Sequence, residues 1–449
     1  YEYLGYTRRG DCGGIVTLQE CPSLACRRII GFHVAGSETN GRGFCNIITK
    51  DKLDILLAGF QETAEIFPQS ESVMTMLNAP VVGSFLGLNK TERTYNMNPA
   101  SSLERTPLHN LWGTYTKVPA KLAPFVSKFT GERVVPMLEA IKGYASPVLH
   151  FEAEHVKQAA YHAFEKVREY TLTHERKVYT FEEAVSGIEG TNVNGIPRST
   201  SPGYPFVLDG ITNKKCFFGS DGPYQFDGSK AIDTKVRVLD IIDKAKGNVR
   251  LEHVYVDFLK DELRAPEKVA AGKSRLISAA PMDYVIAFRM YFLAFTSAVQ
   301  DTRIHNGVAV GINHYSEWDV LARKMKSKGR CTVAGDFKGF DTGEQPQLLW
   351  SILDEINAWY DDGPVNALVR RVLWLEVVHS RHFGGLGSRG EYLYQWNKSL
   401  SSGHPATSII NSFYGLVLFV LTWMDVMGPN RAHEFWYHIY ACTYGDDNV

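Results

Sequence analysis

At 449 residues the chain is long enough for two or three domains, and 44% hydrophobic with 22% charged residues is the composition of a folded globular protein, which excludes a disordered tail. Lys and Arg number 48 against 49 Asp and Glu, so no overall basic field indicates a nucleic-acid partner, and any RNA site must be a local patch. The seven scattered cysteines lack CxxC pairs, which argues against a disulfide framework and a zinc site and suits a reducing compartment.

The first 60 residues predict a β-rich module. Runs of β-branched residues and glycine, separated by turns, occupy 13–17, 26–35 and 43–48. Residues 61–75 follow as a polar linker. The chain begins at Tyr1 rather than Met and has no signal peptide, so we expect it to be a piece of something longer.

Beyond the linker the pattern is mixed α and β. Helical periodicity recurs over 152–170, 346–360 and 365–379. Strands are expected over 254–258, 331–336 and 392–396. The apolar run at 409–427 has the length of a membrane span, but polar residues interrupt it, so a buried helix is the preferred interpretation.

Two segments carry loop or charge signals that are weak when taken alone. The sequence TSPGYP at 200–205 is a rigid turn with an aromatic residue. The segment 260–275 mixes turn formers with five basic residues that can face a triphosphate: Lys260, Arg264, Lys268, Lys273 and Arg275. The alternative for this segment is an ordinary solvated charged face, since acidic residues are mixed in.

Pairs of aspartates stand in two later motifs. In DFKGFD, Asp336 ends an apolar strand pattern and Asp341 follows five residues later, so both can face one cleft. In YGDD, Asp446 and Asp447 sit on a tight Gly turn, which suits a divalent metal beside a phosphate. The alternatives are a helix N-cap with a surface Asp for the first pair and a plain turn for the second.

Between these motifs, SSGHPATSIIN at 401–411 indicates a small-residue loop that leads into a helix. Helical i,i+4 spacing places Thr407 and Asn411 on one face. By itself this segment is no more than a turn and a helix start.

In this order, the five motifs resemble those of the RNA-dependent RNA polymerases of picorna-like positive-strand RNA viruses, from about residue 80 to the end. The resemblance implies an α+β, right-hand fold with fingers and palm. It implies an antiparallel palm sheet whose central hairpin turn carries Gly445, Asp446 and Asp447. Lys338 and His404 are similar to the residues of insect dicistrovirus-like members.

The resemblance also implies roles for individual residues. Two Mg²⁺ ions, with Mn²⁺ as a substitute, would be held by the catalytic carboxylates Asp336, Asp446 and Asp447. The incoming nucleotide would be bound by the five basic residues of 260–275 together with Asp341, Ser402, Gly403, Thr407 and Asn411. The template channel would be lined by Thr200, Ser201, Gly203 and Tyr204.

The implied partners follow from these roles. They are a single-stranded RNA template, a primer or nascent RNA, ribonucleoside triphosphates and other replicase proteins, with protein priming left open. A polar network can require the 2′-hydroxyl of RNA, which both donates and accepts hydrogen bonds. A reverse transcriptase usually has a bulky gate instead, so ribonucleotide preference is expected.

The front piece resembles the end of the chymotrypsin-like cysteine protease that precedes the polymerase in such polyproteins. GDCGG and GFHVAG carry this likeness. It implies Cys12 as nucleophile, an oxyanion hole from the amides of Gly10, Asp11 and Cys12, and a glutamine pocket lined by Thr7 and His33. A buried strand cysteine and a core histidine are the plain alternatives.

The viral polyprotein would be the substrate of this protease. Gln69-Ser70, a glutamine followed by a small residue in the polar linker, is the candidate cleavage site. Gln61-Glu62 is a weaker competitor, and an uncut linker is the alternative.

The expected organisation is a partial protease barrel at 1–60, a linker at 61–75, and fingers and palm at 76–449, truncated after the third palm motif with the thumb missing. The protease general base and acid are also missing, so we expect both activities to be incomplete in this fragment. Two alternatives stay open: a protease as the principal activity, or a non-catalytic RNA-binding scaffold. The resemblance implies membrane-associated replication complexes in the host cytoplasm, without a transmembrane segment in this chain.

Overall fold

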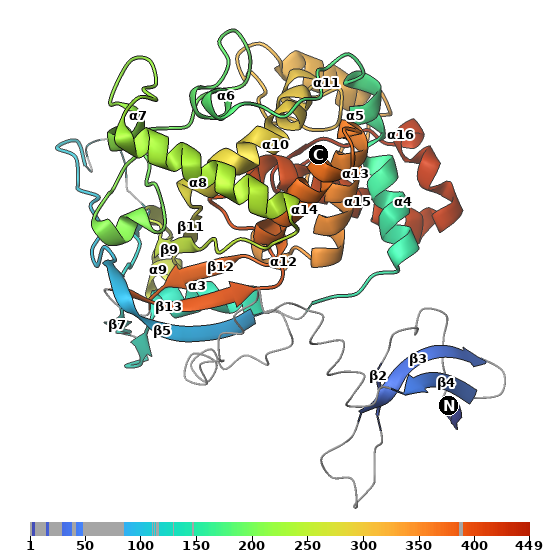
Figure 1. The fold of residues 1–449 in the computed structure, drawn as a ribbon, viewed down its shortest axis with the longest axis horizontal. Coiled ribbons are helices and arrows are strands. Elements are labelled where there is room, and N and C mark those ends of the chain that lie inside the picture. Colours follow the sequence, from blue (N-terminus) through green and yellow to red (C-terminus); the bar gives the residue numbers. More distant parts are fainter. Residues whose placement is uncertain are drawn as a thin grey trace, which may run out of the picture. The chain divides into compact units, whose positions relative to one another are not determined.

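The computed structural model describes residues 2–4, 15–17, 29–37, 42–47, 85–109, 111, 113, 116–128, 130–145, 148–385 and 389–449 (Figure 1). The chain divides into two compact units, Tyr1–Ile66 and Phe67–Val449.

The first unit contains one antiparallel sheet in the order β1-β4-β3-β2. Its strands are β1 (Glu2–Leu4), β2 (Ile15–Thr17), β3 (Ile29–Ser37) and β4 (Arg42–Ile47). The β-rich prediction for this region is therefore confirmed. His33 lies on β3, opposite Cys45 of β4. The predicted protease residues Thr7, Gly10, Asp11 and Cys12 and the predicted cleavage site Gln69-Ser70 lie outside the described residues.

The second unit is built on a five-stranded sheet in the order β11-β9-β12-β13-β5. Only the β12–β9 pair is parallel among its neighbours. The strands are β5 (Phe85–Asn96), β9 (Tyr255–Leu259), β11 (Leu276–Ala279), β12 (Arg381–Gly384) and β13 (Arg389–Trp396). Strands were thus correctly predicted near 254–258 and 392–396.

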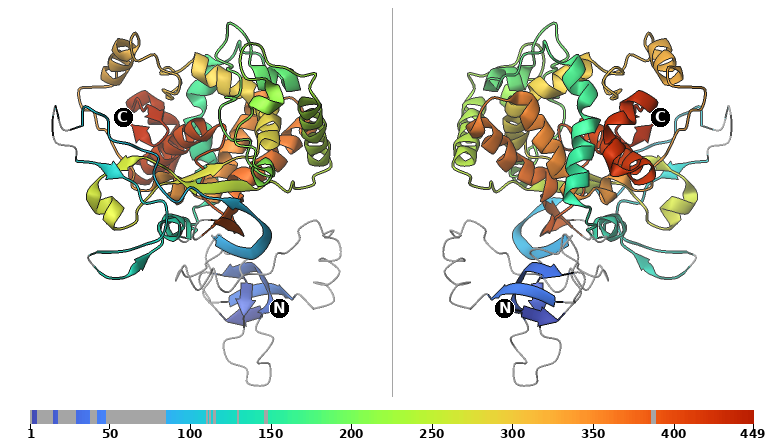
Figure 2. Two further views of the ribbon diagram at one scale, coloured as in Figure 1. Left: turned by 90° about the vertical axis from the view of Figure 1, so that its left-hand side faces the viewer. Right: turned by 90° about the vertical axis from the view of Figure 1, so that its right-hand side faces the viewer.

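Long helices gather on one side of this sheet (Figures 1 and 2). Their apolar side chains form a large buried core. They are α4 (Ala153–Ala163), α8 (Ser229–Lys246), α10 (Met282–Asp301), α13 (Pro346–Tyr360), α14 (Pro364–Val378) and α15 (Thr407–Met427). Proline at the first position starts α13 and α14, since the missing N–H is not needed there.

Shorter elements complete the unit. The helices are α3 (Pro136–Lys142), α5 (Glu165–Tyr170), α6 (Phe181–Ser186), α7 (Lys215–Phe218), α9 (Pro266–Ala270), α11 (Trp318–Lys326), α12 (Phe340–Gly343) and α16 (Phe435–His438), with 3₁₀ turns η2 (Gly143–Ala145), η3 (Phe206–Asp209) and η4 (Pro429–Glu434). Small hairpins pair β6 (Val118–Pro119) with β10 (Leu263–Arg264), β7 (Phe125–Val126) with β8 (Arg133–Val134), and β14 (Thr443–Tyr444) with β15 (Asp447–Asn448).

Two predicted elements differ from the structure. The helix expected over 152–170 is divided at Phe164, which ends α4 and begins α5 while its ring stacks on Phe413 in the core. The strand expected over 331–336 is wrong, because only Gly335 forms a bridge there. The two-residue β15 is its neighbour, and the apolar side chain of Val333 stays 80% exposed.

The apolar run at 409–427 is a helix, as predicted, and belongs to α15. Both α10 and α15 are long and apolar enough to cross a membrane by length and composition. In their most apolar windows, 72% of α10 and 61% of α15 is buried inside the fold. This burial is typical of core helices.

Candidate functional site

The YGDD segment forms the expected hairpin. Tyr444 pairs with Asp447, so Gly445 and Asp446 make the two-residue turn. Gly445 has φ +63°, a conformation that such a turn requires and that glycine adopts without strain. Its N–H donates to the Ser412 hydroxyl at 2.8 Å, which fixes the turn to α15.

Single bridges flank this hairpin on both sides, where a wider antiparallel sheet was expected. Val308 forms a parallel bridge with Thr443, and Gly335 forms an antiparallel bridge with Asn448. The second bridge brings the DFKGFD segment beside β15, with Asp336 next in register to Asp447. A larger ladder does not form because residues 331–336 are mostly exposed and extended without further pairing.

Asp336, Asp446 and Asp447 are all exposed. Carboxylate oxygens are the ligands that Mg²⁺ prefers, so the donor set is chemically suited to this ion. Among the described residues, however, no three His, Cys, Asp or Glu side chains are close enough to form a metal-binding group. A formed metal site is therefore not present in this arrangement.

Asp341 and Asn411, which the resemblance assigned to one nucleotide-binding set, are in contact. The Asn411 amide donates to Asp341 Oδ1 at 2.7 Å. Burial raises the pKa of Asp341, the Asn411 hydrogen bond opposes this shift, and the nearby charges of Asp446 and Arg275 act in opposite directions. The Asn411 carbonyl oxygen is buried without a partner among the described residues, which leaves it able to accept from a ligand hydroxyl.

Thr407 does not join Asn411 at Asp341. Its hydroxyl turns to the carbonyl oxygens of Ser401 and His404, at 3.0 and 2.8 Å, and so fixes the loop that precedes α15. The helical spacing was read correctly, but the Thr407 hydroxyl donates to backbone carbonyls of the preceding loop instead of facing Asp341.

Ser402 and Gly403 are exposed residues of this loop, as is Pro405. The Ser402 hydroxyl lies 3.3 Å from the Ser278 N–H and 3.4 Å from the Leu276 carbonyl oxygen, both on β11. A Cβ on Gly403 would lie 2.1 Å from the Ser278 carbonyl oxygen, so only glycine fits.

Three basic residues of the segment 260–275 lie around Glu262, an acidic residue of the same segment. Glu262 accepts from Arg264 at 3.1 Å and from Arg275 Nε at 2.7 Å, and Lys260 lies 3.5 Å away. These cations, with the Arg275 hydrogen bond first, lower the pKa of Glu262 to about 2. The charge of Arg275 also interacts with Asp341 and Asp446, which links the segment to the hairpin turn.

Lys268 and Lys273 of the same segment are exposed. Arg275 is exposed as well, although it is paired with Glu262. Glu262 was not predicted as a site residue, although the acids within KDELR were its visible signal.

The TSPGYP loop is held by a residue that the motif does not contain. Lys214 donates to the Thr200 hydroxyl at 2.6 Å and to the Ser201 carbonyl at 2.7 Å, and burial lowers its pKa to about 8. Gly203 has φ +72° and lies against the backbone of Ala280, while the ring of Tyr204 packs edge-on against Phe383. Lys214, nine residues after the end of the motif and followed by a second lysine, gave no sequence signal.

Comparisons with known proteins agree with this architecture. A family model described as viral RNA-dependent RNA polymerase matches residues 110–449. The chain is 30% identical to the replicase polyprotein of Drosophila C virus (strain EB) and 29% identical to that of cricket paralysis virus, over its whole length. It spans 27% of the length of each of these relatives.

A solved structure, the Sicinivirus 3Dpol RNA dependent RNA polymerase, has the same fold with a TM-score of 0.65 at 23% identity, covering 82% of this chain and 71% of that chain. The predicted likeness to picorna-like, dicistrovirus-type replicases and the right-hand polymerase fold are thereby confirmed. The chain belongs to the viral RNA-dependent RNA polymerase family.

Proposed function

We propose that this chain carries the nucleotidyl-transfer region of a viral replicase polyprotein and that the complete enzyme performs template-directed ribonucleotidyl transfer. The observation that carries the proposal is the convergence of Asp446, Asp341, Asn411 and Arg275 from four sequence motifs. A scaffold protein has no need of such a convergence of charged and polar groups.

Divalent cations belong to this proposal. Two Mg²⁺ ions, or Mn²⁺ in their place, would be bound by Asp336, Asp446 and Asp447, and the ions would activate the primer 3′-hydroxyl and stabilise the leaving pyrophosphate. The bridge between Gly335 and Asn448 supports this set, since it places Asp336 beside Asp447 of β15.

The protein's own side chains would do the positioning. The buried side-chain oxygen of Asn411, which has no hydrogen-bond partner among the described residues, would accept from a ribose hydroxyl. Exposed Lys268 and Lys273 are suited to the triphosphate, together with Arg275 at the boundary between Glu262 and the hairpin. The TSPGYP loop, held by Lys214, would border the template strand.

The test uses the full-length polymerase of the polyprotein. Asp446→Asn and Asp336→Asn are compared with Asp425→Asn, which makes the same change at an exposed position on α15. Primer extension should disappear in the first two variants and persist in the third, and Mn²⁺ binding measured by electron paramagnetic resonance should weaken in the same two. Extension that survives Asp446→Asn would refute the polymerase proposal and favour the scaffold.

A second candidate function concerns the first unit. We propose that it is the end of a cysteine protease, supported by its separate antiparallel sheet with His33 on β3. Cleavage after Gln69 would release the polymerase. Mass spectrometry of the product made with active protease supplied should give Ser70 as the new N-terminus, and any other N-terminus rejects this site.

The proposed setting is a membrane-associated replication complex in the host cytoplasm, with other replicase proteins as partners. Cell fractionation of the expressed polyprotein tests it. Recovery of the polymerase only in the cytosolic fraction, with none on membranes, would contradict the proposal.

A further inference from the structure

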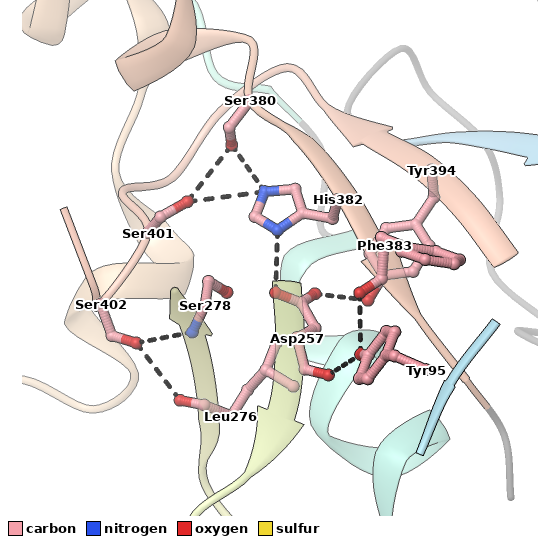
Figure 3. Close-up of polar contacts among 10 residues, drawn as sticks. All are labelled: Tyr95, Asp257, Leu276, Ser278, Ser380, His382, Phe383, Tyr394, Ser401 and Ser402. Carbon is pink, nitrogen blue, oxygen red and sulfur yellow. Dashed lines mark hydrogen bonds and ion pairs between the residues drawn. The ribbon is translucent and has the colours of Figure 1, made fainter. Parts of the chain in front are cut away.

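A series of hydrogen-bonded polar side chains, Asp257, His382, Ser380 and Ser401, leads from the five-stranded sheet to the Ser401–His404 loop (Figure 3). His382 Nδ1 on β12 lies 3.0 Å from Asp257 Oδ1 on β9. The other ring nitrogen lies 2.7 Å from the Ser380 hydroxyl, and Ser401 Oγ lies 3.4 Å from Ser380 Oγ. Each of these four side chains belongs to a residue that is at most 1% exposed.

The hydrogen bonds in this series are all donated in one direction, toward Asp257. The Asp257 carboxylate also accepts from the Tyr394 hydroxyl. A carboxylate only accepts, so His382 Nδ1 carries a proton, and in the neutral ring Nε2 accepts from Ser380. The Ser380 oxygen in turn accepts from Ser401, so the orientation of the Ser401 side chain is tied to a carboxylate on another strand.

The sequence of groups is that of a Ser-His-Asp triad, but its position excludes that chemistry. A nucleophile must reach a substrate, whereas Ser380, His382 and Asp257 are fully buried. Buried polar groups that are completely paired specify one local arrangement. The role of these buried groups must therefore lie in the position of the loop to which Ser401 belongs.

The hydrogen-bonded side chains fix Ser401, which stands at one end of the exposed pair Ser402 and Gly403. Ser401 precedes this pair, and His404 follows it as a second buried anchor. The Ala406 N–H donates to His404 Nδ1 at 3.2 Å, and Tyr284 Oη lies 3.0 Å from Nε2.

Between the anchors Gly403 contacts the sheet through a parallel bridge to Ala279 of β11, while the Ser402 side chain is held less closely. The hydrogen bonds of the Ser402 side chain are long, at 3.3 and 3.4 Å. A cavity of about 350 Å³ that Ser402 helps to line leaves room for movement. The position of the exposed pair is therefore set by the two anchors together with the contact of Gly403 with β11.

We propose that Asp257 and His382 are positioning residues that, through Ser380 and Ser401, place Ser402 and Gly403 for recognition of the ribose of the incoming nucleotide. The inference rests on the proposed polymerase function. It assigns sugar selectivity in part to residues that touch neither the nucleotide nor the metal ions.

The test measures ribose discrimination by the full-length polymerase. Discrimination is the ratio of kcat/KM for a ribonucleotide to kcat/KM for the matching 2′-deoxyribonucleotide in single-nucleotide extension. Ser401→Ala and His382→Asn both interrupt the series of hydrogen bonds. The asparagine side chain still reaches Asp257 but not Ser380. We expect discrimination to fall by roughly fivefold, the value of one neutral hydrogen bond, mainly through a higher ribonucleotide KM.

Two further variants separate positioning from general stability. His382→Gln, whose amide reaches the Nε2 position, should restore discrimination in part. Tyr95→Phe removes a hydroxyl that donates to the backbone carbonyls of Asp257 and Phe383, so it lowers the melting temperature without changing discrimination. Unchanged discrimination in Ser401→Ala and His382→Asn, or an equal loss in Tyr95→Phe, would overturn the inference.

Asp446→Asn in the same assay separates the two proposals. Loss of extension in that variant supports the polymerase function whatever the behaviour of His382. Extension that persists overturns the polymerase function, and the positioning inference falls with it.

Discussion

Acidification from pH 7 to pH 5 is expected to destabilise the fold through His404, the second anchor of the Ser401–His404 loop. Burial lowers the pKa of this histidine from 6.5 to about 3. Below pH 6.5, His404 therefore binds a proton in the unfolded chain but stays neutral in the folded chain. The stability that the neutral ring contributes is present above pH 6.5 and is lost as the pH falls toward 3.

The magnitude follows from the unfolded pKa alone in this range, because pH 5 lies well above the folded value. One and a half pH units below 6.5 correspond to about 2 kcal/mol in the free energy of unfolding. That is a large fraction of the net stability of a domain.

Denaturant unfolding at several pH values, with His404→Asn as the comparison, measures the contribution of His404 to the free energy of unfolding. Asparagine keeps an acceptor for the Ala406 N–H but does not titrate, although it loses the ring contact with Phe288. The variant should be less stable at pH 7, and the gap between the two proteins should shrink by about 2 kcal/mol at pH 5. Burial also lowers the pKa of His253 and His379, but both proteins share these terms and they cancel.

Parallel stability curves for the two proteins would refute the reasoning. They would mean that His404 is protonated as easily in the folded chain as in the unfolded one, and that the ring is open to water. The hydrogen bond from Ala406 would then not anchor the loop.

Two further predictions concern buried groups near the same motifs. Burial raises the pKa of Glu344 well above its usual value, and neither of its oxygens has a partner among the described residues. Its folded state keeps a proton that the unfolded chain loses above about pH 4.5, so stability falls as the pH rises. Glu344→Gln should therefore raise the melting temperature at pH 8; a lower value contradicts this. Lys214→Met removes the donor that holds Thr200 and Ser201. It should weaken binding of single-stranded RNA, measured by fluorescence anisotropy, whereas Lys215→Met, at an exposed neighbour, should not; equal affinities for both variants would show that the loop holds itself.

Local patterns predicted the parts of the fold that depend on nearby residues. The helix at 346–360 and the YGDD hairpin follow from apolar periodicity and a Gly turn, and the structure has both. The strand expected at 331–336 depends on a neighbour more than a hundred residues away, and a single bridge to Asn448 is all that forms. Periodicity cannot report whether such a partner is long enough.

The polar contacts that tie the site together were beyond sequence reasoning for the same reason. Asp257 and His382 are 125 residues apart and belong to no recognised motif. Each alone is an ordinary polar residue within an apolar strand pattern. Only the parallel pairing of β9 and β12 brings them into contact.

Charge pairing at Glu262 shows why the overall composition did not reveal the proposed nucleotide-binding segment. Lys260, Arg264 and Arg275 lie beside Glu262, and the charge of Arg275 also interacts with the acidic hairpin. The five basic residues of 260–275 exceed these acids locally, whereas the net charge of −1 is a sum over the whole chain. A triphosphate carries more negative charge than one carboxylate, so it can compete for cations that Glu262 has already gathered. The local arrangement of charge, rather than its sum, is therefore the feature that supports the proposed nucleotide site.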